Sequence, residues 1–142
     1  MNPSSGSTAG LPQGDEKVRA VRAMFDTIAP RYDLVNRLMT FGLDRHWRRL
    51  AVRSLTLTPG AMVLDVACGT GDLCRDLTAS GYHPTGIDLS SGMLHHARTS
   101  APLVHGDALR LAFPARSFDG VVSGFALRNF VALDRLWAEL AR

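Results

Sequence analysis

The hydrophobic pattern changes its period part-way along the chain. Between residues 16 and 57, apolar side chains recur at every third or fourth position, which is the spacing of an amphipathic helix. The pattern predicts helices over residues 16–28, 32–39 and 44–55, and Asp44 is placed to cap the third of them through its carboxylate. The arginines of that third helix fall mostly off its apolar stripe, so we expect them on a solvent-exposed face.

Beyond residue 58, short apolar runs alternate with segments of helical length. Strands are expected over residues 62–66, 85–87, 103–104 and 118–125. Helices are expected over residues 71–79, 90–99 and 133–140, the second of them capped by Ser90. Strands that alternate with helices predict an α/β fold, in which a parallel sheet is covered by helices on both faces.

Composition and charge place the chain among folded domains. It has 142 residues, of which 46% are hydrophobic and 20% charged, and this suits one domain with its own core. Residues 1–15 are rich in Ser, Gly and Pro, lack the features of a signal peptide, and are expected to form a flexible tail. The net charge of +3 arises in residues 1–53. So small an excess argues weakly for an anionic surface as a partner and hardly at all for nucleic acid.

The two cysteines, Cys68 and Cys74, do not have the spacing of zinc ligands, and no histidine lies near them in the sequence. No metal site is therefore expected. Two cysteines are also too few for a disulfide framework in a chain of this length, so we expect reduced thiols and a cytoplasmic location.

The most informative segment, residues 63–72, has the order strand, glycine loop, helix. Gly69 and Gly71 leave the backbone bare, so a ligand can lie directly against it. The helix that follows directs free N–H groups toward the loop, which favours a carboxylate or a phosphate there. Asp65 stands before the loop in the pattern Asp-x-x-x-Gly-x-Gly. Asp88 ends the second strand, 19 residues after Gly69, where an acidic residue can accept both hydroxyls of a ribose.

The third strand is followed by Asp107 and Ala108, which are placed to flank an adenine ring. Two nucleoside cofactors fit this arrangement. A dinucleotide such as NAD would require a third glycine where the chain has Cys74. S-adenosylmethionine has no pyrophosphate and suits the acidic strand end at Asp65, so it is the favoured cofactor. NAD, or a glycine turn without a ligand, remains the alternative.

At this point the residues resemble a known family. The glycine loop is shared by the class I S-adenosylmethionine-dependent methyltransferases. Residues 24–37 and 41–49 closely resemble the N-terminal signature of the ubiquinone/menaquinone biosynthesis C-methyltransferases of the UbiE/MenG type. Residues 124–129 resemble the Ser-Phe-Gly-Leu-Arg-Asn segment of the same family. The resemblance extends from about residue 16 to the last residue.

The resemblance implies a Rossmann-like class I methyltransferase fold with S-adenosylmethionine bound around the following residues: Thr70, Asp88, Asp107, Ala108 and Gly124. Gly124 occupies the position of a cofactor-contacting serine of the family, and Ser123 comes one residue earlier. This substitution removes a side-chain hydroxyl from that position or shifts it by one residue.

The implied reaction transfers a methyl group to a ring carbon of a prenylated hydroquinone, either demethylmenaquinol or a ubiquinol precursor. Arg128 and Asn129 would be the catalytic residues, with Arg128 favouring the phenolate by its charge, since arginine stays protonated. Tyr32 and Asp33 are expected either to line the substrate entrance or simply to pack and cap their helix. A class I methyltransferase with another small-molecule acceptor remains an alternative.

The family pattern implies a seven-stranded sheet, and this sequence supplies the first four strands. We therefore interpret the chain as C-terminally truncated, with a tail over residues 1–15, a helical segment over 16–57 and a partial cofactor-binding domain over 58–142. The fourth strand would lie at an open edge and favour self-association. The basic helical segment is expected to touch the inner face of the membrane, where the lipid substrate lies. A truncated domain that binds the cofactor without catalysis remains the alternative.

Overall fold

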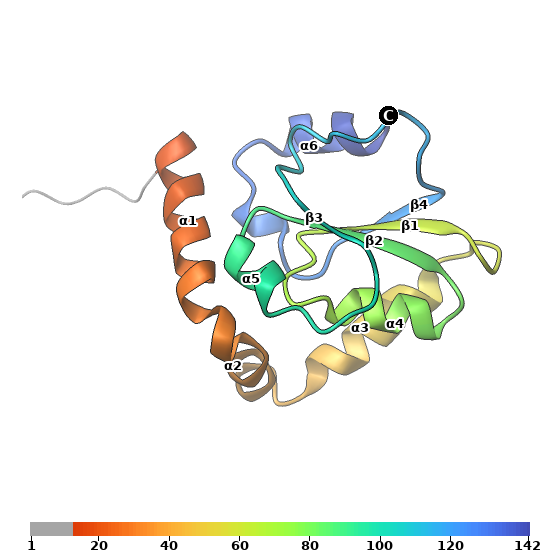
Figure 1. Cartoon of the computed structure of the whole chain (residues 1–142), viewed down its shortest axis with the longest axis horizontal. Coiled ribbons are helices and arrows are strands. Elements are labelled where there is room, and N and C mark those ends of the chain that lie inside the picture. The colour runs from red at the N-terminus through yellow and green to blue at the C-terminus, as the bar shows by residue number, and fades with distance from the viewer. Residues whose placement is uncertain (1–12) are drawn as a thin grey trace, which may run out of the picture.

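The computed structural model describes residues 13–142, which form a small α/β unit with a helical arm at its N-terminal end (Figure 1). The arm contains α1 (Gly14–Ile28), a 3-10 turn η1 (Ala29–Arg31), α2 (Tyr32–Met39) and α3 (Leu43–Ser54). These are the helices that the sequence predicted, displaced at their ends by one or two residues. Of the predicted tail, residues 1–12 lie outside the described part of the chain.

The sheet has strands β1 (Met62–Val66), β2 (His83–Asp88), β3 (Leu103–His105) and β4 (Gly120–Val122). All three pairings are parallel, and the strand order is β3-β2-β1-β4, so β4 lies at an edge. The connections between strands contain α4 (Asp72–Ala79) and α5 (Ser91–His95), and β4 is followed by the 3-10 turn η2 (Leu127–Asn129) and α6 (Leu133–Leu140). The predicted α/β fold with four parallel strands is confirmed.

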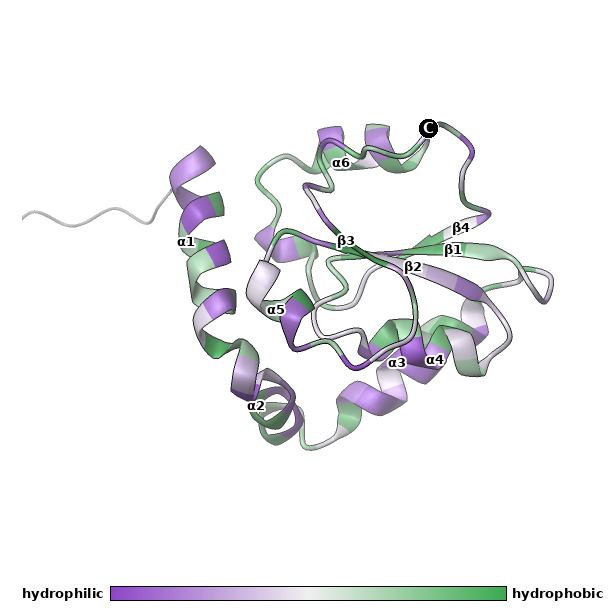
Figure 2. Cartoon of the chain, viewed as in Figure 1, coloured by the Kyte–Doolittle hydropathy of each residue, from purple (hydrophilic) through white to green (hydrophobic). Residues whose placement is uncertain are grey.

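Helices cover both faces of the sheet because successive residues of β1 point to opposite sides. On one face, Leu64 of β1 packs with Leu136 of α6. On the other face, Val63 packs with Val52 of α3 and Leu77 of α4. Figure 1 shows α6 on one side of the strands and α3 with α4 on the other. Figure 2 shows hydrophobic colouring along β1, whereas α1 alternates between hydrophilic and hydrophobic positions.

Two expected elements are shorter than the sequence suggested. The helix expected over residues 90–99 ends at His95, although Ser90 caps it as expected by accepting from the Met93 amide. Beyond it, the Arg98 amide donates to the Thr70 carbonyl at 3.0 Å, so this stretch bonds to the glycine loop rather than to its own helix. The strand expected over residues 118–125 is limited to Gly120–Val122, because β4 has a hydrogen-bonded neighbour on one side only.

The prediction that Asp44 caps α3 is wrong. Gly42, with a left-handed φ of 76°, holds the capping position, and it carries no side chain to do so. Asp44 lies in the first turn, is buried, and binds Arg48 one turn later. Arg48 is therefore also an exception to the expected solvent-exposed arginines of this helix, since its side chain is only 12% exposed. In residues 13–142, no helix is both long and apolar enough to span a membrane.

Candidate functional site

A cleft lies at the carboxyl ends of the strands, where open parallel sheets place their ligands. Its floor contains five of the residues that the sequence singled out, namely Gly69, Asp88, Asp107, Ala108 and Gly124. Its opposite wall comes from the helical arm and includes Val18, Val21, Arg22, Phe25 and Tyr32. The arm thus covers the cleft, so a ligand bound there would contact both the arm and the loops at the ends of the strands.

The glycine loop follows β1 and has an unusual backbone. Ala67, Gly69 and Gly71 all have left-handed φ angles, of 57°, 55° and 81°. A Cβ atom at Gly69 would lie 2.9 Å from the Met93 methyl group, and one at Gly71 would lie 2.6 Å from Thr99 Cγ2. The left-handed backbone favours glycine at both positions, and at Gly71 the close approach of Thr99 adds to that preference, whereas the Met93 methyl group beside Gly69 is the end of a flexible side chain.

Asp88 joins the end of β2 to this loop. Its carboxylate accepts one hydrogen bond from the Gly69 amide at 2.7 Å and another from the Ser90 amide at 2.8 Å. Burial raises the pKa of Asp88, and these amide donors oppose that rise. The carboxylate lines the cleft, so its remaining lone pairs can accept from ligand hydroxyls.

Asp65 does not line the cleft. Its side chain points to the face that α4 covers, and it accepts a hydrogen bond from the Cys74 thiol at 3.3 Å. Its other oxygen, Oδ1, is buried and has no hydrogen-bond partner among the described residues. Burial raises the pKa of Asp65 to about 7. The carboxyl group therefore lies beneath the glycine loop rather than on the ligand side of it.

Thr70 and Gly71 belong to the loop but do not line the cleft. Thr70 is buried, and its hydroxyl donates to the Asp33 carboxylate of α2 at 2.7 Å. Gly71 is the residue before α4 and its amide donates to the Cys68 carbonyl at 2.9 Å. The structure thus brings Thr70 to the arm, whereas Ala67 and Gly69 are the loop residues that line the cleft.

Asp107 and Ala108 lie after β3 in a tight turn. The Asp107 carboxylate accepts from the Leu109 amide at 2.8 Å, and this contact holds the turn. Ala108 and Leu109 are buried, and both line the cleft. They place apolar side chains in the cleft lining beside Asp107, which suits an aromatic ring.

Some residues of the segment after β4 line the cleft, and others lie outside it. Gly124 lines the cleft, and a Cβ there would meet only Leu73 at 3.9 Å. The Ser123 hydroxyl instead donates a hydrogen bond to the backbone carbonyl of Val66 at 2.9 Å. Asn129 lines the cleft, whereas Arg128 is exposed beside it. No hydrogen bond or ion pair of Arg128 occurs within residues 13–142.

Sequence reasoning missed how α1 takes part in the site. The apolar spacing predicted only an amphipathic helix here, and Val18, Val21 and Phe25 of its apolar face line the cleft. Asp26 connects α1 to α5. Its carboxylate accepts hydrogen bonds from the Ser90 hydroxyl at 2.5 Å and from the Gly92 amide at 2.9 Å. These hydrogen bonds lower the pKa of Asp26. The only signal in the sequence was the position of Asp26 within the segment of residues 24–37.

With this geometry in place, comparison with known proteins decides the family. The model of the ubiE/COQ5 methyltransferase family matches residues 13–142. The chain belongs to the ubiE/COQ5 methyltransferase family. The demethylmenaquinone methyltransferase of Thermobifida fusca (strain YX) is 41% identical to it over 136 residues, covering 90% of the chain and 58% of that protein. The chain therefore spans less than two thirds of the length of the curated relatives that it matches.

Solved structures bear on the fold. The [4+2]-cyclase SpnF superposes with a TM-score of 0.72 at 22% identity, over 90% of this chain and 55% of that one. An N-methyltransferase of Haemonchus contortus, solved with phosphomonomethylethanolamine and S-adenosylhomocysteine, has a TM-score of 0.60 at 26% identity. It covers 66% of this chain and 25% of that one. Together with the parallel sheet, these similarities confirm the Rossmann-like fold.

The residues of the cleft fit an adenosyl group. The bare backbone at Gly69 allows close approach, Asp88 offers acceptors for two hydroxyls, and the wall at Ala108 suits a ring. Gly124 leaves open space on the same side. Within residues 13–142, no cluster of His, Cys, Asp and Glu side chains could hold a metal ion.

Proposed function

We propose that this chain carries the S-adenosylmethionine site of an enzyme that methylates a ring carbon of a prenylated hydroquinone in respiratory quinone biosynthesis. The acceptor would be demethylmenaquinol or a ubiquinol precursor, and the names of the relatives favour the former. The observation that carries the proposal is the Asp88 carboxylate, which bonds to Gly69 and lines the cleft. Membership of a methyltransferase family favours this cofactor over NAD.

Each part of the cofactor has a matching group in the cleft. Asp88 would accept from the ribose hydroxyls, and Asp107 with Ala108 would hold the adenine ring. The backbone at Gly69 and the open space at Gly124 would accommodate the methionyl part. Thr70 and Gly71 would maintain the shape of the loop from within it, and Asp65 would do so from beneath it. When bound, S-adenosylmethionine supplies an electrophilic methyl group.

For methyl transfer to a ring carbon, the protein must make that acceptor carbon nucleophilic. A phenol has a pKa of about 10, so its phenolate is scarce at neutral pH unless a cation stabilises it. Arg128 is exposed beside the cleft with no ion-pair partner in the described residues, and its permanent charge suits this role. Asn129 lines the cleft and would orient the acceptor oxygen by hydrogen bonding.

The substrate is a lipid, and the arm has a surface suited to meeting it at a membrane. Leu38, Phe41 and Trp47 are 67%, 92% and 52% exposed around the turn between α2 and α3. Arg45 and Arg49 are exposed close by. A surface that combines apolar and basic side chains binds anionic lipid interfaces. We therefore place the protein in the cytoplasm, with peripheral contact at the inner face of the membrane.

The open edge of the sheet gives a further expectation about assembly. β4 pairs with β1 on one side, and its other side has no strand partner in residues 13–142. Unpaired backbone groups at an edge are a template for another strand. Self-association of the chain through β4 is therefore part of the proposal.

Calorimetric titration of the 142-residue chain with S-adenosylmethionine, and in parallel with NAD, tests the cofactor. We expect binding of S-adenosylmethionine alone, and binding of NAD alone would contradict the proposal. Incubation with demethylmenaquinol in detergent micelles tests the reaction. Cofactor binding without any methylation would favour the second candidate, a non-catalytic cofactor-binding domain. Methylation of another small molecule in place of the quinol would change the substrate assignment.

A further inference from the structure

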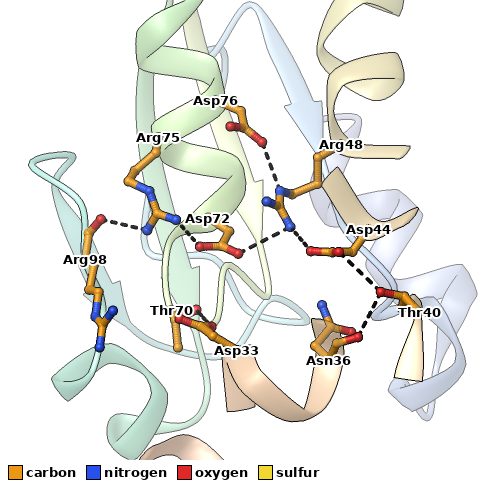
Figure 3. A network of polar contacts seen from close by, with 10 residues as sticks. All are labelled: Asp33, Asn36, Thr40, Asp44, Arg48, Thr70, Asp72, Arg75, Asp76 and Arg98. Carbon is orange, nitrogen blue, oxygen red and sulfur yellow. Dashed lines mark hydrogen bonds and ion pairs between the residues drawn. The ribbon is translucent and has the colours of Figure 1, made fainter. Parts of the chain in front are cut away.

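The glycine loop is held from outside by the helical arm at two neighbouring points (Figure 3). The first is Thr70, whose hydroxyl donates to the Asp33 carboxylate at 2.7 Å across 37 positions of sequence. The second is Asp72, the first residue of α4, whose carboxylate lies 3.2 Å from Arg48 Nη1. Thr70 and Asp72 flank Gly71, so the arm contacts the loop on both sides of its last glycine.

Arg48 is surrounded by acidic side chains. It contacts Asp44 of its own helix at 2.6 Å and Asp76, one turn into α4, at 2.9 Å, in addition to Asp72. Burial opposes the charge of Arg48, but hydrogen bonds and the charges of Asp76, Asp72 and Asp44 outweigh it and raise its pKa. Arg75 also pairs with Asp72 and donates to the Arg98 carbonyl at 2.9 Å. Arg48 and Arg75 thus share the compensation of Asp72, and Arg48 also compensates Asp44 and Asp76.

This charge compensation bears on what the loop can bind. The first turn of α4 offers free N–H groups, which attract an anionic ligand group. An uncompensated carboxylate at Asp72, in that same turn, would repel the anion. The loop also has an unusual backbone, since Ala67, Gly69 and Gly71 are all left-handed, and hydrogen bonds from other segments help to hold it. Contacts from outside are therefore needed both for its shape and for its charge.

We propose that Arg48 and Asp33 are positioning residues of the cofactor site: both hold the glycine loop in shape, and Arg48 together with Arg75 neutralises Asp72, so that a carboxylate-bearing ligand can bind in the cleft beside the loop. Neither side chain lines the cleft, so both act through the loop. The ligand part of this inference rests on the proposed cofactor. The loop-holding part rests on the contacts alone.

The variants Arg48→Met and Asp33→Asn test the proposal, with Arg49→Met as the matched control. Arg49 is the next residue of α3, is exposed, and makes no ion pair within residues 13–142. Two probes are titrated calorimetrically. S-adenosylhomocysteine carries the amino-acid carboxylate, whereas 5′-methylthioadenosine has the same nucleoside without it.

We expect Arg48→Met to weaken S-adenosylhomocysteine binding by about fivefold to tenfold, the usual size of a charge effect at a helix start. Binding of 5′-methylthioadenosine should fall by less than about twofold, because that probe has no carboxylate to repel. In the double variant Arg48→Met/Asp72→Asn, affinity for S-adenosylhomocysteine should recover. Equal losses for both probes, or no loss for either, would overturn the electrostatic role.

Hydrogen exchange on the unliganded chain supplies a second readout. The amides of Gly71 and Arg98, which donate to Cys68 and Thr70 within the loop region, should exchange faster in Arg48→Met and in Asp33→Asn but not in Arg49→Met. Unchanged exchange would overturn the loop-holding role. If the unaltered chain binds neither probe, the proposed cofactor fails, and exchange still decides whether the arm holds the loop.

Discussion

The Asp88 carboxylate lies 2.7 Å from the Gly69 amide and accepts its hydrogen. This contact links the end of β2 to the loop after β1 and brings together the two features that define the cleft. Because the carboxylate also accepts from the Ser90 amide at 2.8 Å, it is held at both oxygens. A ligand that binds at Gly69 therefore meets a fixed anionic acceptor beside the bare backbone.

Replacing Asp88 with asparagine should weaken S-adenosylhomocysteine binding by at least about tenfold. The amide can offer one oxygen where the carboxylate offers two, so either Gly69 or Ser90 loses its acceptor, and a ligand hydroxyl meets a donor. Calorimetry would measure the loss. Asp134→Asn on exposed α6 is the control, and its binding should match the unaltered chain. Retained affinity in Asp88→Asn would remove the observation on which the proposed function rests.

Gly71→Ala should destabilise the chain more than Gly81→Ala does. Both glycines have similar left-handed φ angles, 81° and 86°, so the backbone strain is matched, at about 1–2 kcal/mol. At Gly71 the added methyl group also meets Thr99 at 2.6 Å, whereas nothing lies within 4 Å at Gly81. Urea denaturation of the two variants isolates the steric contribution. Equal losses in free energy of unfolding would show that Thr99 moves aside at no cost.

Asp65→Asn should make the chain more stable above neutral pH. Burial raises the pKa of Asp65 from 3.8 to about 7, so the folded state favours the protonated form. The stability that this protonated group provides is complete below pH 3.8 and is lost as pH rises through about 7. At pH 8 the charged carboxylate costs on the order of a few kcal/mol, and asparagine removes that cost.

Urea denaturation at pH 5 and pH 8 measures this effect. The difference in free energy of unfolding between the variant and the unaltered chain should grow toward the higher pH. A difference that stays constant would mean that Asp65 keeps the same protonation state when the chain unfolds. Asp119→Asn is a suitable comparison, because that carboxylate accepts from the Met62 amide and is exposed.

Asp26→Asn should loosen α1 from the body of the fold. The carboxylate accepts from both the Ser90 hydroxyl and the Gly92 amide, and an asparagine oxygen is a weaker acceptor than a charged one. Loss of about 1 kcal/mol at this contact would speed amide exchange in α1 by about fivefold. Glu16→Gln, in the exposed first turn of α1, is the control.

The same contact predicts a dependence on pH. Hydrogen bonds from Ser90 and Gly92 lower the pKa of Asp26 below 3.8. Its stabilising effect should therefore be present above pH 3.8 and disappear as the pH falls through the lowered pKa. Exchange in α1 that is no faster in Asp26→Asn at neutral pH would show that apolar packing alone holds the helix.

Most of the fold could be predicted from the sequence because its signals are local. Apolar runs such as residues 62–66 form strands wherever both faces are covered, and glycines before a helix mark a ligand loop. Boundaries were less certain. The strand expected to reach Phe125 ends at Val122, because the run of apolar residues continues past the point at which β1 offers a pairing partner.

The structure brings several of the predicted site residues into one cleft and places others outside it. Gly69, Asp88, Asp107, Ala108 and Asn129 line the cleft, in positions that the motifs indicated. Side-chain direction was not predictable where a strand is buried on both faces, because the alternating pattern that reveals direction is absent there. Asp65 shows this, since its carboxyl group lies under α4 rather than in the cleft.

By itself, the sequence determined the order of strands and helices, the glycine loop and the family signature, since each depends on residues close together in the chain. Only the tertiary structure decided which distant residues meet. Asp33 reaches Thr70, Arg48 reaches Asp76 across 28 positions, and Asp26 reaches Ser90. These contacts depend on how the helical arm packs across the ends of the strands, and no local pattern of residues encodes that packing.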